Sequence, residues 1–492
     1  MTEIIIASAT IYDGSGGPGY LADVTIQGER IAAVDPASGV LPDGAIDGRG
    51  LALAPGFIDV HTHDDLVAIT APAMLPKITQ GVTTVVVGNC GISAGTGRAT
   101  GSTLPDPMVL LGAPEAFRYD SFAAYAEAVE AAGPATNVIA LVGHTALRAR
   151  HLDRLDRDAT EAERLAMRAD LADALASGAF GFSTGLAYAN AGSASTQEVM
   201  TVAEALRETG ALYCTHLRSE GAAILDAIDE AVAIARDAAA PLVVSHLKCA
   251  GASQYGRSGE ILDRLDHAAG TQPVGCDCYP YTASSSTLDL RQVVPETPIM
   301  ISWSDPEPEQ AGRMLKDIAE GWGVDPVDAA RRLQPAGAVY HCMDERDVDR
   351  ILAHRLTMVG SDGLPCDPRP HPRLWGSFPR VIAHYVRERG LLTLPIAVRK
   401  MTGLTADRLG LADRGYIRPG MAADLVLFNP ERIADQASYD DPQQPADGVV
   451  GVWVNGIATL EHGIVTGARG GRMLRRGSAP QHFNQKEVSS ND

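Results

Sequence analysis

From residue 56 onward the chain alternates short apolar runs with long stretches rich in Ala, Glu and Arg, and this alternation limits the folds it can adopt. Strands that alternate with helices predict βα units and a parallel sheet. Eight runs have the length and composition of such strands: 56–63, 83–90, 137–144, 179–184, 212–216, 242–246, 274–279 and 357–362. We therefore predict an α/β fold with a (β/α)8, TIM-like barrel. A doubly wound open sheet stays the alternative, because strands counted from one sequence can be off by one or two.

The two ends of the chain differ from the middle. Residues 1–55 and about 415–480 show short, turn-punctuated strands with period-two patterning. We therefore expect a small β domain formed from both chain ends, flanking a barrel of residues 56–414. Between the seventh and eighth runs lies a long insertion, residues 284–350, which contains Trp303, Trp322 and an amphipathic helix near 314–320. A connection of this length is usually functional, so we expect a lid-like insertion.

Composition narrows the classes of partner. The 492 residues carry a net charge of −20, which argues against nucleic acid or an anionic membrane, because both would repel the protein. The first 13 residues lack the basic and apolar regions of a secretory signal, and no apolar stretch approaches the roughly 20 residues of a membrane span. Seven scattered cysteines fit a reducing compartment. We expect a cytoplasmic protein that acts on a small molecule.

Six metal-ligand side chains stand at the ends of predicted strands. Residues i and i+2 of a strand point to the same face, so His61 and His63, at the end of the first run, would project side by side. The other four end later runs: Cys90, His216, His246 and Asp362. A single histidine or cysteine of this kind is more often a core residue. Six at the C-terminal strand ends predict a metal site, and imidazole with thiolate favours zinc over magnesium or calcium.

Several motifs give the chain a resemblance to a known family. They are Pro-Gly-Phe-Ile-Asp-Val-His-Thr-His at 55–63, Gly-Asn-Cys-Gly at 88–91, Thr-His-Leu-Arg at 215–218, Ser-His-Leu-Lys at 245–248, Gly-Ser-Asp-Gly-Leu-Pro at 360–365 and His-Pro-Arg-Leu-Trp-Gly at 371–376. Over essentially its whole length the chain resembles the amidohydrolase superfamily, and within it the N-acyl-D-amino-acid deacylases, or D-aminoacylases. The resemblance implies zinc-dependent hydrolysis of the amide bond of N-acyl-D-amino acids, giving a carboxylate and a free D-amino acid.

The resemblance also implies how the ligands divide. Cys90, His216 and His246 would hold one zinc tightly, and the remaining three, His61, His63 and Asp362, would form a second, weaker position. Many two-metal members of the superfamily bridge their metals with a carboxylated lysine, but the predicted fourth strand, 179–184, contains none. In the deacylases a cysteine at the position of Cys90 takes metal instead.

The resemblance assigns roles to further residues. Asp362 is the expected general base, which takes a proton from the attacking water and passes it to the leaving amine; a turn residue before Gly363 is its structural alternative. His144, at the end of the third run, would lie outside the ligand set. The substrate carboxylate would be bound by Lys248, Tyr279 and Arg373. Tyr188 and Ser285 would lie nearby as further substrate-binding residues.

The pocket for the substrate side chain gives two opposite signals. Leu288 and Leu290 favour a hydrophobic D-amino acid, whereas Arg291 could face a distal carboxylate, as in N-acyl-D-glutamate or N-acyl-D-aspartate. We predict the hydrophobic class, with the acidic class as the alternative. Two other functions stay open, an amidohydrolase that acts on a cyclic amide or a D-dipeptide and a non-catalytic scaffold related to hydantoinases. The missing bridging lysine argues against the cyclic amide, and the retained ligands argue against the scaffold.

Overall fold

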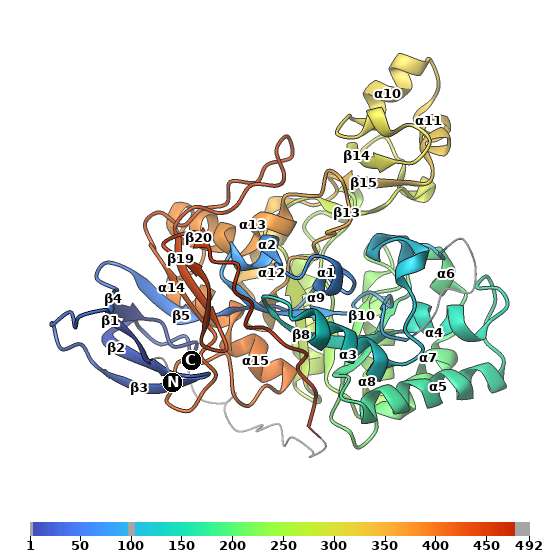
Figure 1. Cartoon of the computed structure of the whole chain (residues 1–492). Helices are drawn as coiled ribbons and strands as arrows, with labels where there is room; N and C mark the ends of the chain where they lie inside the picture. Colours follow the sequence, from blue (N-terminus) through green and yellow to red (C-terminus); the bar gives the residue numbers. More distant parts are fainter. Residues whose placement is uncertain (1–2, 97–103, 478–492) are drawn as a thin grey trace.

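The computed structural model describes residues 3–96 and 104–477. Figure 1 shows three parts: a barrel with its helices, a β sheet beside it that contains the first described residues, and an insertion that projects away from the barrel. The three strand systems are a nine-stranded sheet, an eight-stranded sheet and a three-stranded sheet. Residues 478–480, the end of the expected β domain, lie outside the described residues.

The eight-stranded sheet is parallel and forms the barrel. Its strands are β6 (Phe57–Asp59), β7 (Val82–Val87), β8 (Asn137–Gly143), β9 (Gly181–Gly185), β10 (Leu212–His216), β11 (Leu242–Val244), β12 (Val274–Cys278) and β16 (Thr357–Val359). They follow one another in chain order. Just past the strand ends the two outer members meet, because the Asp362 amide donates to the His61 carbonyl at 2.8 Å and Thr62 forms a parallel bridge with Gly363. The predicted (β/α)8 barrel is confirmed, and the open-sheet alternative is wrong.

Each of the eight predicted runs overlaps a barrel strand, but several strands end sooner than their runs. β6, β7, β11 and β16 stop two to four residues before the predicted ends. Runs of β-branched residues such as Val-Thr-Thr-Val-Val-Val in β7 form strands whose residues are all buried, because helices cover the outer face of the barrel and side chains of other strands fill its interior. The metal-ligand residues therefore stand mostly in the loops directly after the strands.

Helices surround the barrel and connect its strands (Figure 1). They are α1 (Val67–Thr70), α2 (Leu75–Ile78), α3 (Phe122–Ala132), α4 (His144–His151), α5 (Glu161–Ala176), α6 (Ala189–Gly192), α7 (Thr196–Ala203), α8 (Ile224–Asp237), α9 (Ser258–Ala269), α12 (Glu345–Ala353), α13 (Arg373–Arg380), the π-helical η7 (Val381–Glu388), α14 (Leu394–Met401) and α15 (Gly403–Leu409). The helix α5 begins with a capping box, in which the Thr160 side chain accepts from the Glu163 amide and the Glu163 side chain accepts from the Thr160 amide.

The nine-stranded sheet combines both ends of the chain. Its N-terminal strands are β1 (Glu3–Ile11), β2 (Tyr20–Gln27), β3 (Arg30–Pro36), β4 (Ile46–Asp47) and β5 (Ala52–Pro55), and its C-terminal strands are β17 (Leu425–Phe428), β18 (Val449–Val454), β19 (Ile457–Glu461) and β20 (Ile464–Val465). The two halves join where β5 pairs with β17 in antiparallel register. The expectation that the two ends form one β structure is confirmed.

The insertion has a sheet and helices of its own. Its sheet consists of β13 (Ser284–Thr287), β14 (Ile299–Ser304) and β15 (Ala336–Tyr340), with β15 in the middle. Its helices are α10 (Leu315–Trp322) and α11 (Pro326–Leu333), and α10 corresponds to the helix expected near residues 314–320. In Figure 1 these two helices lie farthest from the barrel. The role of the insertion as a lid stays a prediction.

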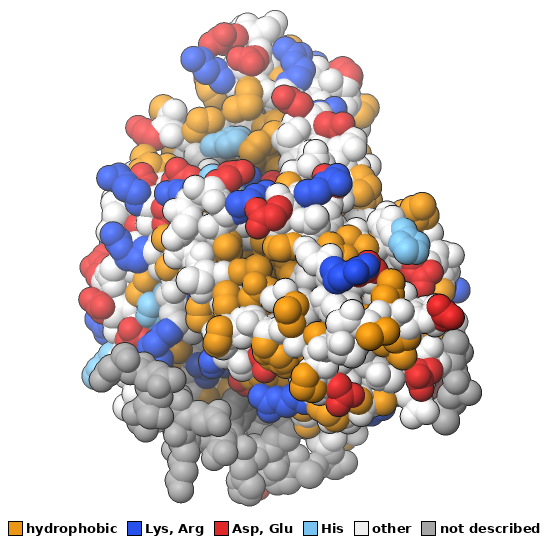
Figure 2. Space-filling view, turned by 90° about the vertical axis from the view of Figure 1, so that its left-hand side faces the viewer, with side chains coloured by type: hydrophobic (Ala, Val, Ile, Leu, Met, Phe, Trp, Pro, Cys, Tyr) orange, Lys and Arg blue, Asp and Glu red, His pale blue; other side chains and the backbone are white. Residues whose placement is uncertain are grey.

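The surface carries charges of both signs beside apolar side chains. Figure 2 looks onto the side of the molecule where the nine-stranded sheet lies in Figure 1, and hydrophobic side chains gather in the middle of this face. Large exposed hydrophobic residues of the nine-stranded sheet include Tyr20, Leu21, Ile457 and Ile464. All seven cysteines are free. Within the described residues, no helix is both long and apolar enough to cross a membrane.

Candidate metal centre

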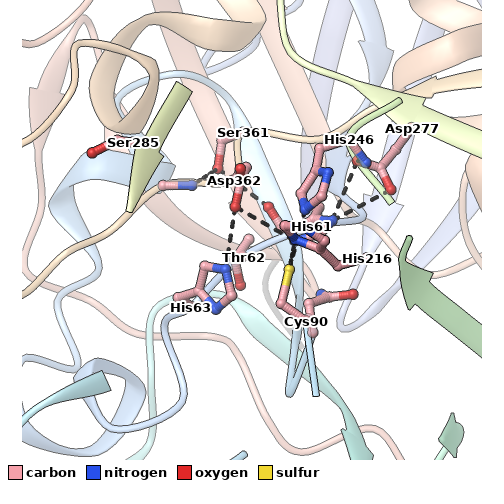
Figure 3. A network of polar contacts seen from close by, with 12 residues as sticks. His61, Thr62, His63, Cys90, His216, His246, Asp277, Ser285, Ser361 and Asp362 are labelled. Atoms are coloured by element: carbon pink, nitrogen blue, oxygen red, sulfur yellow. Dashed lines mark hydrogen bonds and ion pairs between the residues drawn. The ribbon is translucent and has the colours of Figure 1, made fainter. Parts of the chain in front are cut away.

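The six predicted ligands come together at one end of the barrel. Figure 3 shows that the side chains of His61, His63, Cys90, His246 and Asp362 point toward one another, with His216 beside them. The ring centroids of His61 and His246 are 4.9 Å apart, and those of His216 and His246 are 4.4 Å apart. All six side chains are buried. The convergence follows from the fold, because the C-terminal ends of parallel barrel strands meet at one rim.

Four of these side chains form a compact group around the Cys90 sulfur. The Sγ atom lies 3.2 Å from His61 Nε2 and 3.3 Å from His246 Nε2. Asp362 completes the group, with Oδ1 at 3.5 Å from His61 Nε2 and 3.2 Å from His63 Nε2. The possible ligand atoms of His61, Cys90, His246 and Asp362 all lie within 4.8 Å of one another. One ion could therefore contact all four.

A second group contains a residue that the sequence did not indicate. Glu220, His216 and His246 form another set with metal-ligand atoms within 4.8 Å of one another. Glu220 Oε1 lies 3.0 Å from His246 Nδ1, and Oε2 lies 3.8 Å from His216 Nε2. Glu220 stands in the loop four residues after His216, so no strand end marked it. The i, i+4 spacing from a predicted ligand was the available signal.

The donor set suits a transition metal. Imidazole nitrogens and one thiolate are the ligands that zinc prefers. Burial of His63 and His216 leaves the Nδ1 atom of each without a hydrogen-bond partner. A buried ring nitrogen without a partner is costly unless another group, such as an ion, contacts it. His216 is predicted to bind the tightly held zinc, and His63 is predicted to belong to the weaker position. Each predicted position therefore contains one ring nitrogen that an ion could contact.

The local charges favour the ligand forms of the thiol and the carboxyl group. Burial alone would raise the pKa of the Cys90 thiol, but the imidazoles of His61 and His246 outweigh burial and hold this pKa well below its ordinary value. Burial would likewise raise the pKa of Asp362, yet the guanidinium of Arg373, together with His246 and His61, holds it well below its ordinary value. Cys90 and Asp362 are therefore disposed to be negatively charged.

Three of the ligands have an unusual backbone conformation. Cys90, His246 and Asp362 have positive φ angles of 54°, 35° and 49°. A non-glycine residue in this region costs about 1–3 kcal/mol, and such residues cluster at functional sites. Glycine completes the loop of Cys90, because a Cβ on Gly88 would lie 2.2 Å from the Leu141 carbonyl oxygen and one on Gly91 2.7 Å from the Gly185 nitrogen.

Three residues predicted to bind the substrate lie together beside Asp362. Arg373 is fully buried and stacks on Tyr279, with its guanidinium carbon 4.6 Å from the ring centroid. It also donates from Nη2 to the Ser285 carbonyl at 3.0 Å. The Tyr279 hydroxyl, the Ser285 hydroxyl and Arg373 Nε are all buried without a hydrogen-bond partner. These unpartnered groups can all donate to an anion that enters the site.

The other two predicted binding residues flank the histidines. The Lys248 ammonium contacts Glu220, and its Nζ lies 2.8 Å from His246 Nδ1. The Tyr188 ring lies 4.8 Å from the His216 ring, centroid to centroid. Lys248 is therefore already neutralised by Glu220, whereas Arg373 is neutralised by Asp362.

A cavity of about 660 Å³ opens over the centre. Its lining includes His216, His246, Lys248, Ser285 and Asp362. The insertion supplies the facing wall, which contains the residues of the two side-chain hypotheses: Leu288, Leu290 and Arg291. The Arg291 side chain is 64% exposed and pairs with Asp289, whose Oδ2 lies 2.7 Å from Nη2.

His144 belongs to a different buried cluster. Its Nε2 lies 3.0 Å from Glu198 Oε1, and Glu198 also contacts the Arg148 guanidinium and accepts from the Ala159 amide at 2.7 Å. His144 stands at the start of α4, and its ring contacts Phe182. It is not a member of either group of possible metal ligands.

Comparison with known proteins identifies the class that this barrel and its centre represent. The family model described as "Amidohydrolase family" matches residues 44–283 and 306–458. The chain therefore belongs to the amidohydrolase family. The gap between the two matched segments falls within the predicted insertion.

Proteins with high sequence identity to this chain indicate its group within the amidohydrolase family. The chain is 47% identical to N-acyl-D-aspartate deacylase of Alcaligenes xylosoxydans xylosoxydans, over 99% of this chain and 97% of the relative. Its structure is similar to the crystal structure of a D-aminoacylase, with a TM-score of 0.93 and 47% identity over 96% of this chain and 99% of the other. The N-acyl-D-glutamate deacylase of Bordetella bronchiseptica, solved with zinc and a phosphonate mimic of the tetrahedral intermediate, gives a TM-score of 0.91 and 43% identity over the same shares. The predicted resemblance to the N-acyl-D-amino-acid deacylases is confirmed.

Proposed function

We propose that this chain is a zinc-dependent N-acyl-D-amino-acid deacylase, which hydrolyses the amide bond and releases a carboxylate and a free D-amino acid. The observation that carries the proposal is that two adjacent sets of groups lie together beside one cavity, which is lined by Asp362 and Ser285, one member of each set. One set holds metal-ligand atoms within 4.8 Å of one another, and the other holds buried, unpartnered donors of Arg373, Tyr279 and Ser285. An N-acyl amino acid presents a scissile carbonyl for the first set and a carboxylate for the second.

The proposed ligands are the six that the sequence indicated. Cys90, His216 and His246 would hold one zinc tightly, and His61, His63 and Asp362 would provide a second, weaker position. The central place of the Cys90 sulfur, near both His61 and His246, supports a shared role for this thiolate in the two positions. Zinc bound here supplies a Lewis acid that polarises the amide carbonyl and lowers the pKa of water.

The proposed chemistry of the chain itself centres on Asp362. Its carboxylate accepts a proton from the attacking water and then passes this proton to the nitrogen of the leaving amine. His63 and Arg373 hold the two oxygens of this carboxylate, at 3.2 Å and 2.9 Å, and so fix its orientation. The proton acceptor is therefore held in place before the substrate enters.

The substrate carboxylate would be bound by Arg373, Tyr279 and Ser285, with Lys248 and Tyr188 at the edge of the same cavity. Arginine can bind a carboxylate through two parallel hydrogen bonds, and the two hydroxyls add further donors. Fixing the carboxylate, the acyl carbonyl and the side chain at three places distinguishes the D from the L enantiomer. The insertion, residues 284–350, would cover the bound substrate as a lid, since Ser285 and Leu288 come from it.

Hydrophobic D-amino acids are the proposed substrates, and Leu288 and Leu290 in the cavity wall support them. The second candidate is an acidic D-amino acid, and Arg291 in the same wall favours it. Asp289 contacts Nε and Nη2 of Arg291, which leaves Nη1 outside this pair. Among the similar proteins, one is named a D-aminoacylase, without a stated side chain, and two are named N-acyl-D-aspartate and N-acyl-D-glutamate deacylase.

The proposed location is the cytoplasm, because seven free thiols fit a reducing compartment. A non-catalytic scaffold would need no ligand-type side chains at the strand ends, and a cyclic-amide hydrolase of the two-metal kind would need a bridging lysine, which β9 lacks.

A direct assay tests the proposed function. Purified, zinc-loaded protein is incubated with N-acetyl-D-methionine, N-acetyl-D-glutamate, N-acetyl-D-aspartate and their L-forms, and released amino acid is measured. We expect release from D-substrates at least 100-fold faster than from the L-forms, and loss of activity on removal of zinc with a chelator. Absence of release from every D-substrate would refute the proposal, and hydrolysis of a cyclic amide instead would favour the alternative.

A further inference from the structure

Each of the three strained ligand positions is held by a buried carboxylate that is not itself in the ligand set. Asp277 contacts His246, Asp65 contacts the loop of Cys90, and Asp59 contacts the residue before Asp362. Asp59 and Asp65 are fully buried, and Asp277 is 1% exposed. Burying a carboxylate is costly unless its oxygens accept hydrogen bonds, so this recurrence calls for a reason.

Asp277, in β12, connects two of the histidines. Its Oδ1 accepts from the His246 backbone amide at 2.9 Å, and its Oδ2 lies at hydrogen-bond distance, 3.4 Å, from His61 Nδ1. Figure 3 shows Asp277 behind His61 and His246, on the far side from Asp362. A carboxylate beside Nδ1 favours the tautomer in which Nδ1 carries the proton. His61 Nε2, which faces the Cys90 sulfur, then keeps its lone pair for an ion.

Asp65 spans the loop that contains Cys90. Its Oδ2 accepts from the Gly88 amide at 3.2 Å, and its Oδ1 accepts from the Ala94 amide at 3.1 Å. One carboxylate thus connects the two ends of the loop 88–94, in which Cys90 is the third of seven residues. The loop is also fixed on its other side, where the Gly91 amide donates to the Ser183 hydroxyl at 3.1 Å.

Asp59, at the end of β6, holds the segment that leads to Asp362. Its Oδ1 accepts from the Ser361 amide at 2.8 Å. Its Oδ2 accepts from Lys77 Nζ at 2.9 Å, and the same ammonium donates to the Ser361 hydroxyl at 3.0 Å. Lys77 is fully buried, so its charge depends on Asp59 and on Asp64, whose Oδ2 lies 3.2 Å away.

We propose that Asp59, Asp65 and Asp277 are positioning residues, which hold the left-handed backbone of Asp362, Cys90 and His246 and thereby fix the geometry of the metal site before metal binds. The inference rests on the proposed zinc site. A ligand that is already in place loses little entropy on binding, so the three carboxylates would raise metal affinity without touching the ion.

The sharpest test is Asp277→Asn, which preserves size. Only the oxygen of the Asn side chain can accept the hydrogen bond from the His246 backbone amide. The side-chain NH₂ group therefore faces His61 Nδ1. Nδ1 then has to accept, the ring proton moves to Nε2, and the nitrogen that faces Cys90 can no longer bind zinc. We expect the dissociation constant of the weaker zinc position, to which His61 is assigned, to rise about 10- to 100-fold when it is measured by competition with a chelator.

Asp65→Asn gives a readout that needs no metal. Asp65 accepts hydrogen bonds from the amides of Gly88 and Ala94, and in the variant one of these amides would face the side-chain NH₂ group instead of an oxygen. The loop would therefore open. In the metal-free protein we expect faster amide hydrogen exchange over residues 88–94 and at least tenfold faster modification of Cys90 by a thiol reagent. For Asp59 the variant is Asp59→Asn, in which Asp64 remains as the charged partner of Lys77.

Asp347→Asn is the matched control. Asp347 is equally buried and accepts from the amides of Gly256 and Ser258 at 2.7 Å and 3.2 Å, but it is not among the possible metal ligands or their contacts. We expect its thermal midpoint to fall while its zinc dissociation constant stays within twofold of wild type.

Two results would overturn the inference: wild-type zinc affinity in Asp277→Asn and Asp65→Asn, or an equal loss of affinity in Asp347→Asn. If the wild-type protein binds no zinc at all, the proposed function fails separately. Exchange over residues 88–94 in metal-free Asp65→Asn then still decides whether the carboxylate holds the loop.

Discussion

Arg373 and Asp362 form a buried ion pair, in which Nη1 lies 2.9 Å from Oδ2 and the arginine has no exposed surface. The residue expected to bind the substrate carboxylate therefore also contacts the expected general base. One guanidinium would contact both groups, with Nη1 on Asp362 and the unpartnered Nε available to the substrate.

This double contact changes what the substitution of Arg373 should do. Arg373→Ala is expected to raise KM about 10- to 100-fold, because a charge-assisted hydrogen bond to the carboxylate is lost, and also to lower kcat, because Asp362 loses its orienting partner. Arg373→Lys should restore part of kcat but less of KM, since lysine is only a point charge. Steady-state kinetics separate the two effects, and an unchanged KM in Arg373→Ala would exclude it as the anchor.

The role of Asp362 is tested by Asp362→Asn. An amide of the same shape cannot accept the proton of the attacking water, so we expect kcat to fall about 10²- to 10⁴-fold. The thermal midpoint and the content of tightly bound zinc should stay near wild type, since the tight position is assigned to other residues. Near-normal turnover would show that Asp362 is a ligand or a turn residue only.

Cys90 should determine whether the protein holds its metal. Cys90→Ala removes the sulfur that lies near both His61 and His246, and we expect tightly bound zinc to fall below one tenth of the wild-type amount in elemental analysis. Cys276→Ala is the control, because this buried thiol contacts Thr357 and is not a candidate ligand. Equal zinc content in the two variants would remove Cys90 from the site.

Arg291 should separate the two classes of substrate. Arg291→Leu is expected to lower kcat/KM for N-acetyl-D-glutamate about tenfold, as for loss of one charge-assisted contact, and to leave N-acetyl-D-methionine within about threefold. The conservative Arg291→Lys should retain more of the activity toward the acidic substrate. If both substrates lost activity equally, Arg291 would act on the structure of the cavity wall and not on selection.

Glu198 should make the fold sensitive to acid. Burial would raise the pKa of Glu198, but His144 and Arg148 outweigh burial and hold it well below its ordinary value near 4.5. A depressed pKa in the folded state contributes stability above the unfolded pKa, and this stability is lost as the pH falls below about 4.5. Glu198→Gln should therefore lower the thermal midpoint at pH 7, and its difference from wild type should become smaller as the pH falls from about 4.5 to 3. A constant difference between the two proteins from pH 7 to pH 3 would contradict this assignment.

The barrel could be predicted because its signals are local. Each strand is a short apolar run, and the residue that ends it, such as His216 or Cys90, is chemically distinct from the run. The rim of a parallel barrel then brings such residues together whatever the packing details. The order of the ligands around the rim also follows, because the strands keep their chain order.

Other features of the site could not be predicted, because they depend on packing between distant segments. Lys77 lies in a short helix, and no residue near it in the sequence indicates that it is buried. Its ammonium nevertheless contacts both Asp59 and Ser361. Glu220 is one acidic residue among many, and only the position of the loop after β10 brings it to His246. Similarly, no local pattern indicates that Asp277 lies against His61.

The pairing of β5 with β17 has a consequence for how the protein is made. β5 leaves the ribosome long before β17, so its outer edge has no partner while the whole barrel is being synthesised. An unpaired edge invites pairing with other chains. Nascent chains that stop short of residue 425 should therefore be the forms most prone to aggregation, and the last strands act as the closing step of assembly.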